Sequence, residues 1–246
     1  LEFDASGILV EGFDHLPTAY GKYNAPYYDA HLSALGYVKD ADYVEYLIKV
    51  PEIIPDRYAR MAQLVSVKNS LHQAPLKRHS DITPYLDGVY SCMNAAYAPL
   101  HGYSQLTEGQ WEDLKKQFLG NVNVDYLSII LDADEHVVAF GVGMPSLAKA
   151  MQKAKGKLFP LGWCHIMNAL KQNDTLDLLL IAIRPDYQNK GVNAMIFDKF
   201  AQGITKNGIK FIESTRELED NVSVQNLWHY LEHNLTKRAR TYLKTM

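Results

Sequence analysis

The segment from residue 175 to residue 206 constrains the fold more than any other part of the sequence. Residues 176–183, LDLLLIAI, form an unbroken apolar run of strand length, which predicts a strand buried on both faces. The polar segment RPDYQNKG follows directly. Apolar residues then recur at the spacing of a helix, at Ala194, Phe197, Ala201 and Ile204. A buried strand, a glycine-bearing loop and a helix in immediate succession predict an α/β fold.

Residues 82–172 predict further helices and strands in a definite order. Apolar spacing predicts a helix over 82–97 with Ser80 as its N-cap, and the Thr107/Gln110 pair is a capping-box pattern for a second helix. Two β-runs flank the acidic turn at 132–135 and predict a hairpin. Residues 146–172 predict an inserted pair of helices, and we expect the second, which is apolar on several faces, to be covered by other elements.

The two ends of the chain add strands and helices to this order. Residues 7–13 predict a strand, residues 23–37 a helix, and residues 42–50 an alternating strand that we interpret as an edge strand. We interpret residues 51–80 as a connection with a short helix and a first strand. Asn207-Gly208 predicts a helix stop before the strand IKFIEST, and the chain then closes with a helix over 221–233 and a final strand.

Composition excludes several classes of partner. The 246 residues carry 25 Lys+Arg against 28 Asp+Glu, a formal charge of -3, so the whole chain has no basic field that would attract nucleic acid or an anionic membrane surface. The apolar runs are far shorter than the roughly 20 residues of a membrane span. Cys92 and Cys164 have no disulfide-scaffold or metal-ligand pattern. We therefore expect a cytoplasmic protein without nucleic acid, membrane or metal partners.

The order of elements from Ile82 onward resembles the GNAT superfamily of acyl-CoA transferases, with one helical insertion. The centre of the match is IRPDYQNKGVNA, similar to that superfamily's Q/R-x-x-G-x-G/A motif, here Gln188, Gly191 and Asn193. The resemblance implies a central mixed, mostly antiparallel twisted sheet flanked by helices. It also implies acetyl-CoA or another acyl-CoA as cofactor and a small-molecule amine as acceptor.

The chemistry of the motif explains its spacing. Backbone N–H groups at a helix N-terminus, aided by the helix dipole, hold a pyrophosphate, and a glycine permits its close approach. Asn193 departs from the family's small residue at that position. By the resemblance, the backbone of the preceding strand pairs with the pantetheine arm. The implied cofactor-binding residues are Ile181, Ala182, Ile183, Gln188, Asn189, Lys190, Gly191, Val192, Asn193 and Ala194.

The resemblance also implies candidate catalytic residues. The superfamily's second motif is loosely met by Asn221, Trp228, Tyr230 and Asn234-Leu235, and Tyr230 is the candidate acid that protonates the departing thiolate. Asp177 is the candidate base that deprotonates the acceptor amine, with an edge-facing aspartate as the alternative.

Four polar or aromatic residues fall where the acceptor would bind. These candidate substrate-binding residues are Asn94, Tyr97, His101 and Tyr103. For Tyr97, core packing is the alternative.

The N-terminal segment predicts a tandem organisation. Its helix-Gly-Tyr-strand order repeats that of the C-terminal segment, and Gly36-Tyr37 falls where Asn234-Leu235 falls in the second copy. This resembles a bacterial group of tandem GNAT-like proteins of unassigned substrate, and we interpret the chain as starting inside the first copy. The expected domains are residues 1–50 as the end of that copy, 51–80 as a connection and first strand, and 81–246 as the acyltransferase domain with insertion 146–172.

The leading functional hypothesis is direct N-acyl transfer, without a covalent enzyme intermediate. The alternatives are an acyl-CoA-binding sensor without turnover and a structural module, and the sequence leaves open a homo-oligomer. HYLEH at 229–233 matches a zinc-protease pattern but lacks a third ligand downstream. The lysines at 153, 155 and 157, and Lys237, Arg238 and Arg240, are interpreted as solvated faces.

Overall fold

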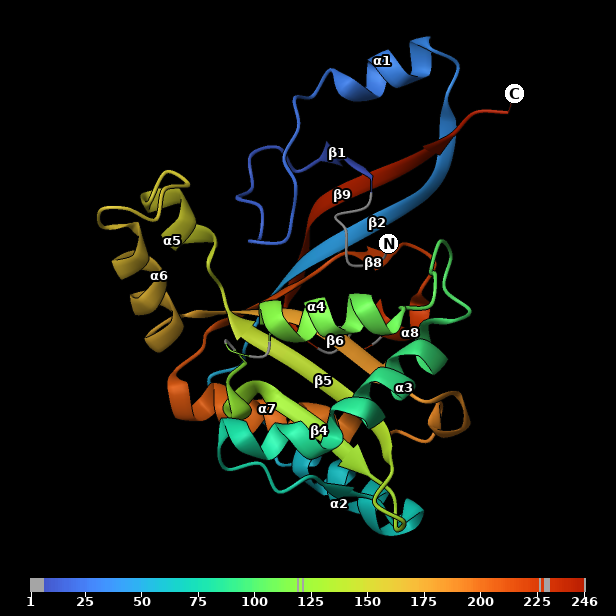
Figure 1. The fold of residues 1–246 in the computed structure, drawn as a ribbon, viewed down its shortest axis with the longest axis vertical. Helices are drawn as coiled ribbons and strands as arrows, with labels where there is room; N and C mark the ends of the chain where they lie inside the picture. The colour runs from blue at the N-terminus through green and yellow to red at the C-terminus, as the bar shows by residue number, and fades with distance from the viewer. Residues whose placement is uncertain (1–6, 119, 121, 226, 228–230, 246) are drawn as a thin grey trace. The chain divides into compact units, whose positions relative to one another are not determined.

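A computed structural model describes residues 7–118, 120, 122–225, 227 and 231–245 of the chain (Figure 1). The chain forms two compact units. The first unit comprises Leu1–Pro51, Pro145–Leu178 and Ile209–Met246, and the second comprises Glu52–Met144 and Leu179–Gly208. Each unit therefore combines segments that are far apart in the sequence.

The first unit is built mainly from strands. Its elements are β1 (Ile8–Glu11), α1 (Tyr28–Ala34), β2 (Val38–Lys49), α5 (Ala148–Lys153), α6 (Gly162–Lys171), the start of β6 (Thr175–Ile183), β7 (Phe211–Ser214), β8 (Glu217–Leu218), α8 (Val222–Gln225) and β9 (His233–Leu243). The strand order is β1-β9-β2-β7-β6, with β8 beside β2. Antiparallel pairing prevails, and only the β6–β7 pair in this order is parallel.

Strand β2 is an interior strand of this sheet. It pairs with β9 from Val38 to Ile48, and Figure 1 shows the two strands side by side. On its other side it pairs with β7 and β8. The prediction of an edge strand at 42–50 is therefore wrong. Its alternation of charged and apolar residues is typical of a strand with one face exposed to solvent. In the structure, however, Asp42 and Glu45 are only 4% and 3% exposed. Both are buried because cations from neighbouring elements pair with them.

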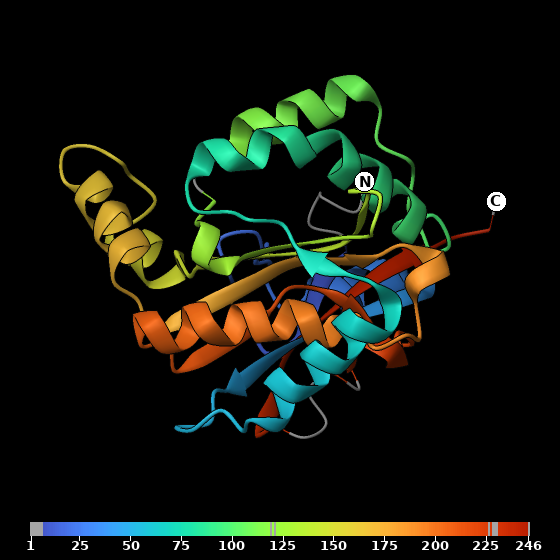
Figure 2. The ribbon, with the colours of Figure 1, turned by 90° about the horizontal axis from the view of Figure 1, so that it is seen from below.

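The second unit has helices on both faces of a short sheet. Its elements are α2 (Arg57–Asn69), β3 (His72–Gln73), the 3-10 helix η1 (His79–Tyr85), α3 (Leu86–Tyr97), α4 (Glu108–Phe118), η3 (Val124–Tyr126), β4 (Leu127–Leu131), β5 (Val137–Pro145), the end of β6, η4 (Pro185–Tyr187) and α7 (Asn193–Asn207). The strand order is β6-β5-β4-β3. Figure 2 shows α3 and α4 on one face and α2 and α7 on the other.

Two glycines let the helices approach strand β5 closely. A Cβ at Gly88 of α3 would lie 2.5 Å from the Val137 side chain, and one at Gly141 would lie 2.4 Å from Ile196 of α7. Neither site can hold a larger residue without moving its neighbour. The core of the unit forms between these layers, around residues such as Phe140 and Phe200, which are almost fully buried.

The expected mixed, mostly antiparallel sheet flanked by helices is confirmed, and so are several local signals. Thr107 and Gln110 form the predicted capping box, with both backbone-to-side-chain bonds present. The β4–β5 hairpin encloses the acidic turn at 132–135, and Gly208 ends α7 in the left-handed conformation. Strand β9 begins at His233, inside the segment predicted as a terminal helix.

The predicted helix at 82–97 begins differently from the expectation. Residues His79–Tyr85 form the 3-10 helix η1, and α3 begins only at Leu86. Ser80 lies inside η1 and is not its N-cap, because η1 begins after Arg78, where the Asp81 carboxylate accepts the backbone N–H groups of Lys77 and Arg78. Pro84 explains why α3 begins later than predicted, since proline cannot donate the α-helical hydrogen bond and disfavours α geometry at the residue before it.

The inserted helices are present as α5 and α6, but α6 is not covered as predicted. Its buried residue is Gly162, whereas Trp163 and Met167 are 51% and 46% exposed. Large apolar side chains of α6 are therefore exposed to solvent.

Candidate functional site

The loop between β6 and α7 has a backbone that demands glycine at one position. After η4 the chain turns through Asn189 and Gly191, with φ of 60° and 77°, and α7 begins at Asn193. A Cβ at Gly191 would lie 3.1 Å from Val65 of α2, tighter than an ordinary contact. Gly191 is therefore required by its left-handed φ and by its packing, and the turn presents the N-terminus of α7 to its surroundings.

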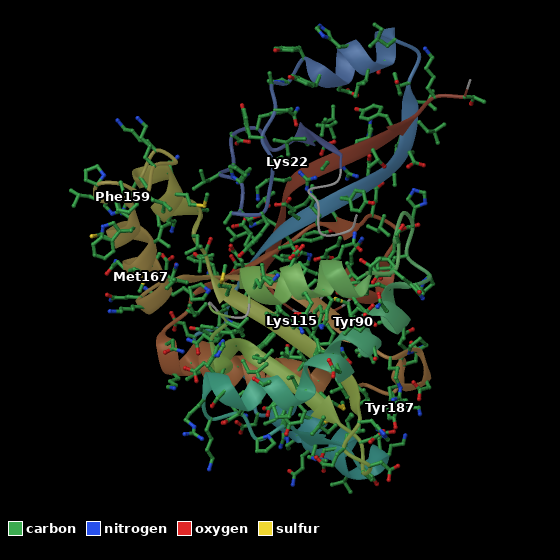
Figure 3. All side chains as sticks on the ribbon, in the orientation of Figure 1. Lys22, Tyr90, Lys115, Phe159, Met167 and Tyr187 are labelled. Carbon is green, nitrogen blue, oxygen red and sulfur yellow. The ribbon has the colours of Figure 1, made fainter. Side chains whose placement is uncertain are left out.

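Two cations flank this loop. The guanidinium of Arg184 and the ammonium of Lys190 lie 4.9 Å and 4.8 Å from the ring centre of Tyr187, which Figure 3 labels. Arg184 also makes a bidentate ion pair with Asp186, with both N–O distances 2.7 Å. Lys190 is exposed, and within the described part of the chain it has no ion pair. Lys190 thus supplies an exposed positive charge three residues before α7.

The alternation of backbone hydrogen bonds along β6, toward β5 at one residue and toward β7 at the next, is interrupted before the strand reaches the loop. The Thr175 carbonyl accepts from Ser146 N, just past β5, and the Leu178 carbonyl accepts from Thr215 N, just past β7. Regular alternation would direct the Arg184 N–H to the β7 side, but it donates to the Val138 carbonyl of β5. One irregularity therefore lies between Leu178 and Arg184. Irregularities of this kind bend a strand and are over-represented beside active sites.

Three of the predicted substrate-binding residues lie together in the second unit. The Tyr97 hydroxyl donates to the Ile181 carbonyl of β6 at 3.0 Å, and the Tyr97 and Tyr103 rings meet edge to face at 5.7 Å. The Asn94 side-chain oxygen accepts from the Tyr103 hydroxyl and from Leu106 N. His101 is exposed on the same loop.

These contacts refine the expected roles of the cluster. Asn94 ties the 98–106 loop to α3, which is a positioning role. The Ile181 carbonyl, expected to pair with pantetheine, already accepts one hydrogen bond from Tyr97. At the end of the strand, the Gln188 side chain donates to the Ile183 carbonyl at 3.1 Å and fastens the loop to β6.

Asp177 lies in the first unit within a buried row of charges. It is 0% exposed, and neither carboxylate oxygen has a hydrogen-bond partner among the described residues. Burial raises the pKa of Asp177 to about 7; the Ser146 hydroxyl opposes this rise, and the Glu213 carboxylate adds to it. Tyr20 is a further neighbour, and burial together with the Asp177 charge raises the pKa of its hydroxyl to about 12.

The row crosses four strands on one face of the sheet. Asp177 of β6 is in register with Glu213 of β7, and Glu45 of β2 is in register with Lys237 of β9. Lys237 contacts both Glu45 and Glu213, and its side chain is only 3% exposed. The interpretation of Lys237 as part of a solvated face is therefore wrong. Arg238 and Arg240 pair with the buried Asp42.

The sequence reasoning missed Glu45 and Glu213 altogether. The signal that could have found them is the presence of acids inside apolar strand runs, YVEYLI and FIES, close to a strand that carries a lysine.

The candidate acid Tyr230 lies outside the described residues, as do Trp228 and His229. Asn234 and Leu235 belong to β9, and His233 starts that strand, so the second histidine of HYLEH is not on a helix. Within the described residues, no helix is both long and apolar enough to cross a bilayer.

Sequence comparison finds two curated relatives at low identity. The protein YghO of Escherichia coli K12 is 25% identical over 246 residues, which cover 97% of this chain and 62% of YghO. A bacterial ceramide synthase of Caulobacter vibrioides is 27% identical over 168 residues, 67% of this chain and 42% of the relative. The chain thus spans about two fifths to three fifths of these proteins. No protein-family model matches it.

Solved structures share the fold at very low sequence identity. A GCN5-related N-acetyltransferase from Sphaerobacter thermophilus superposes with a TM-score of 0.53 and 9% identity, over 92% of this chain and 57% of that one. A GCN5-related glucosamine N-acetyltransferase region of a fungal multi-domain β-N-acetylglucosaminidase gives 0.51 and 11% identity, over 87% of this chain and 22% of that one. The chain therefore has the fold of the GCN5-related N-acetyltransferases.

Proposed function

We propose that the protein is an acyl-CoA-dependent N-acyltransferase, most simply an N-acetyltransferase, that acts on a small amine-bearing acceptor. The observation that carries the proposal is the β6–loop–α7 segment, in which Gly191 is held in a left-handed conformation two residues before a 15-residue helix. A helix N-terminus reached through such a turn is suited to a pyrophosphate.

The charges around the loop favour an anionic ligand such as the pyrophosphate of coenzyme A. The Ala194 and Met195 N–H groups donate to the Gly191 and Val192 carbonyls, so the attraction for an anion would come from the N–H groups before them and from the helix dipole, which adds partial positive charge. Lys190 adds a full charge beside them, and Arg184 a second that is shared with Asp186. Residues 188–194 would hold the pyrophosphate, and Ile181, Ala182 and Ile183 would pair with the pantetheine arm.

The proposed chemistry uses Asp177 as base. Asp177 is 0% exposed, so it would accept the proton of the acceptor amine through water, and a carboxylate with a pKa of about 7 is matched to this role at neutral pH. Tyr230 would then protonate the departing thiolate, and a backbone N–H of β6 would stabilise the oxyanion. The acyl-CoA supplies the activated acyl group. The amine attacks it directly, so no covalent intermediate on the protein is proposed.

One of the two relatives supports amide formation at a coarse level. Ceramide is an amide of a long-chain amino alcohol, and the relative named for its synthesis is similar to two thirds of this chain. This favours an acceptor that presents a primary amine.

The first experiment measures thermal stabilisation by free coenzyme A and by acetyl-CoA, since a ligand that binds the native state must raise the melting temperature. Gly191→Ala is expected to abolish the rise. Gly208→Ala is the matched control, because Gly208 has a similar φ of 69° at the opposite end of α7. That variant should lose similar stability and keep the ligand response. A ligand response that survives Gly191→Ala, or none in the unmodified chain, would refute the site.

A second candidate function is binding of acyl-CoA without turnover. Asn193 favours it, because it stands at the first residue of α7, where the family has a small residue. The two candidates are separated by incubating the protein with acetyl-CoA and a panel of amines while free thiol is measured. Thiol release that falls at least 10-fold in Asp177→Asn and in Tyr230→Phe supports transfer. Binding without thiol release in any variant supports the second candidate.

A further inference from the structure

The inserted segment between Pro145 and Thr175 forms a defined helical hairpin. Helices α5 and α6 pack against each other, and backbone bonds close the connecting loop, with Gly156 N donating to the Met151 carbonyl and Trp163 N to the Leu158 carbonyl. A Cβ at Gly162 would lie 1.8 Å from the Lys157 carbonyl oxygen, so the loop folds tightly onto the start of α6. The backbone of this loop therefore has a defined conformation.

The hairpin displays large apolar side chains to the outside. Phe159 at its tip is 80% exposed, and Leu161 and Leu158 are 66% and 59% exposed. Trp163 and Met167 extend this surface along α6, and Figure 3 labels Phe159 and Met167 on the hairpin. The Trp163 indole N–H donates to the Pro160 carbonyl, which satisfies its polar atom and leaves an apolar ring exposed. We call these five residues the apolar tip.

The hairpin also carries an excess of positive charge. Residues 136–173 contain no Asp or Glu, although the whole chain has a formal charge of -3. They contain five lysines, at 149, 153, 155, 157 and 171, and each of these is exposed. Lys149 pairs with Asp174, and in the part of the chain that the structure describes the other four have no ion pair. The net charge of the whole chain therefore conceals a strongly basic segment.

We propose that the hairpin binds the surface of an anionic phospholipid bilayer, with the apolar tip at the boundary between headgroups and acyl chains. Exposed Leu, Phe and Trp beside lysines form the pattern by which interfacial helices bind membranes, with the aromatic rings at headgroup level and the lysines on anionic headgroups. A second copy of the chain fits less well, because a symmetric contact through the hairpin would bring the lysines of both copies together. The hairpin lies on the surface and does not span the bilayer. The proposal does not depend on the transferase reaction.

The test is co-sedimentation of the full chain with large vesicles, either of phosphatidylcholine alone or with 30% phosphatidylglycerol, without coenzyme A. We expect binding to the anionic vesicles that weakens at least 10-fold in Leu158→Ser/Phe159→Ser and in Lys155→Glu/Lys157→Glu. The matched controls should bind normally: Val67→Ser alters a side chain that is 76% exposed on α2, and Lys68→Glu/Lys77→Glu makes the same charge change outside the hairpin.

A second readout reports contact directly. Cys164 is exposed on α6 and Cys92 is buried, so a thiol-reactive, polarity-sensitive dye will label the hairpin. Its emission should rise on anionic vesicles and not on neutral ones.

The proposal fails if vesicles are not bound, if the hairpin variants bind as well as the controls, or if light scattering without lipid shows self-association that these variants abolish. Melting curves establish that each variant is folded. If the protein binds vesicles but not coenzyme A, the proposed transferase function is refuted and the proposed membrane binding is not.

Discussion

Asp177 combines complete burial with two carboxylate oxygens that lack hydrogen-bond partners among the described residues. Such a group lowers the stability of a fold when it is ionised, because burial desolvates its charge, and the nearby Ser146 hydroxyl and Lys237 ammonium offset only part of this cost. Residues that cost stability in this way are typical of sites selected for chemistry. The neighbouring Glu45–Lys237–Glu213 arrangement differs, because there the charges are paired.

The raised pKa makes the Asp177 hypothesis testable through stability. Because its folded pKa is about 7 against roughly 4 in an unfolded chain, the native state loses stability as the pH rises from about 4 to 7. Asp177→Asn removes this loss. We expect the variant to exceed the unmodified protein by about 2–4 kcal/mol in unfolding free energy at pH 8, and by less at pH 5.

Urea unfolding at the two pH values measures this difference. Asp220→Asn, at an exposed aspartate of the same unit, should show no such trend. An Asp177→Asn variant that is less stable than the unmodified protein at pH 8 would show that the carboxylate is compensated by a partner.

Asn193 is the residue at which the loop departs from the family pattern. Its side chain stands at the first position of α7, where bound phosphate oxygens would lie. If its bulk crowds them, Asn193→Ala should tighten coenzyme A binding by about 1 kcal/mol, or roughly fivefold. Isothermal titration measures this change. Weaker binding in the variant would instead show that the amide donates a hydrogen bond to the ligand.

At the scale of elements, Asp42 secures β2 to β9. Its carboxylate accepts from the Arg240 guanidinium at 2.7 Å and 3.0 Å, and Lys39 and Arg238 are also its partners. The bonds from Arg240 hold the pKa of Asp42 well below its ordinary value, with burial opposing the effect. A group with a depressed folded pKa stabilises the native state above the unfolded pKa and loses that contribution as the pH falls.

Asp42→Asn should therefore lower the free energy of unfolding by about 2–4 kcal/mol at pH 7, because it leaves two half-buried guanidinium groups without their charge partner. The deficit should shrink as the pH falls below about 4. Denaturant melts across this range measure it. Asp14→Asn, at an exposed aspartate of the same unit, is the control and should be near neutral. An equal deficit at low and neutral pH would assign the effect to packing.

At the scale of the whole molecule, the N-terminal 50 residues are an integral part of the first unit. Strand β2 lies between β9 on one side and β7 with β8 on the other, so its removal would expose two unpaired strand edges. The tandem-copy hypothesis for these residues remains a prediction, and their pairing with β9 gives them a structural function in either case.

A chain that starts at Pro51 should consequently fail to fold as the full chain does. We expect it to aggregate or to melt at least 15 °C lower, because β9 and β7 would lack their shared partner. Adding residues 1–50 as a separate peptide should partly restore the melting temperature. A truncated chain that stays monomeric at the full melting temperature would show that β2 is dispensable. Circular dichroism melts and light scattering provide both measurements.

The sequence by itself determined the elements whose signals are local. The apolar run of β6, the Thr107/Gln110 capping box, the acidic hairpin turn and the glycine loop before α7 each depend on residues a few positions apart. Backbone geometry and short-range hydrogen bonds decide them, so periodicity and turn chemistry suffice to predict them. The order of these elements carried the resemblance to the fold.

Only the tertiary structure decided which polar residues are buried and which apolar ones are exposed. Burial depends on what packs opposite a residue, and that partner comes from distant sequence: Lys237 pairs with Glu45 across 192 positions and is buried, although its local pattern suggests solvent. In the same way, α6 looks like a core helix in sequence, but its Trp163 and Met167 are 51% and 46% exposed. Local pattern measures hydrophobicity along the chain, whereas burial is a property of contacts that only folding creates.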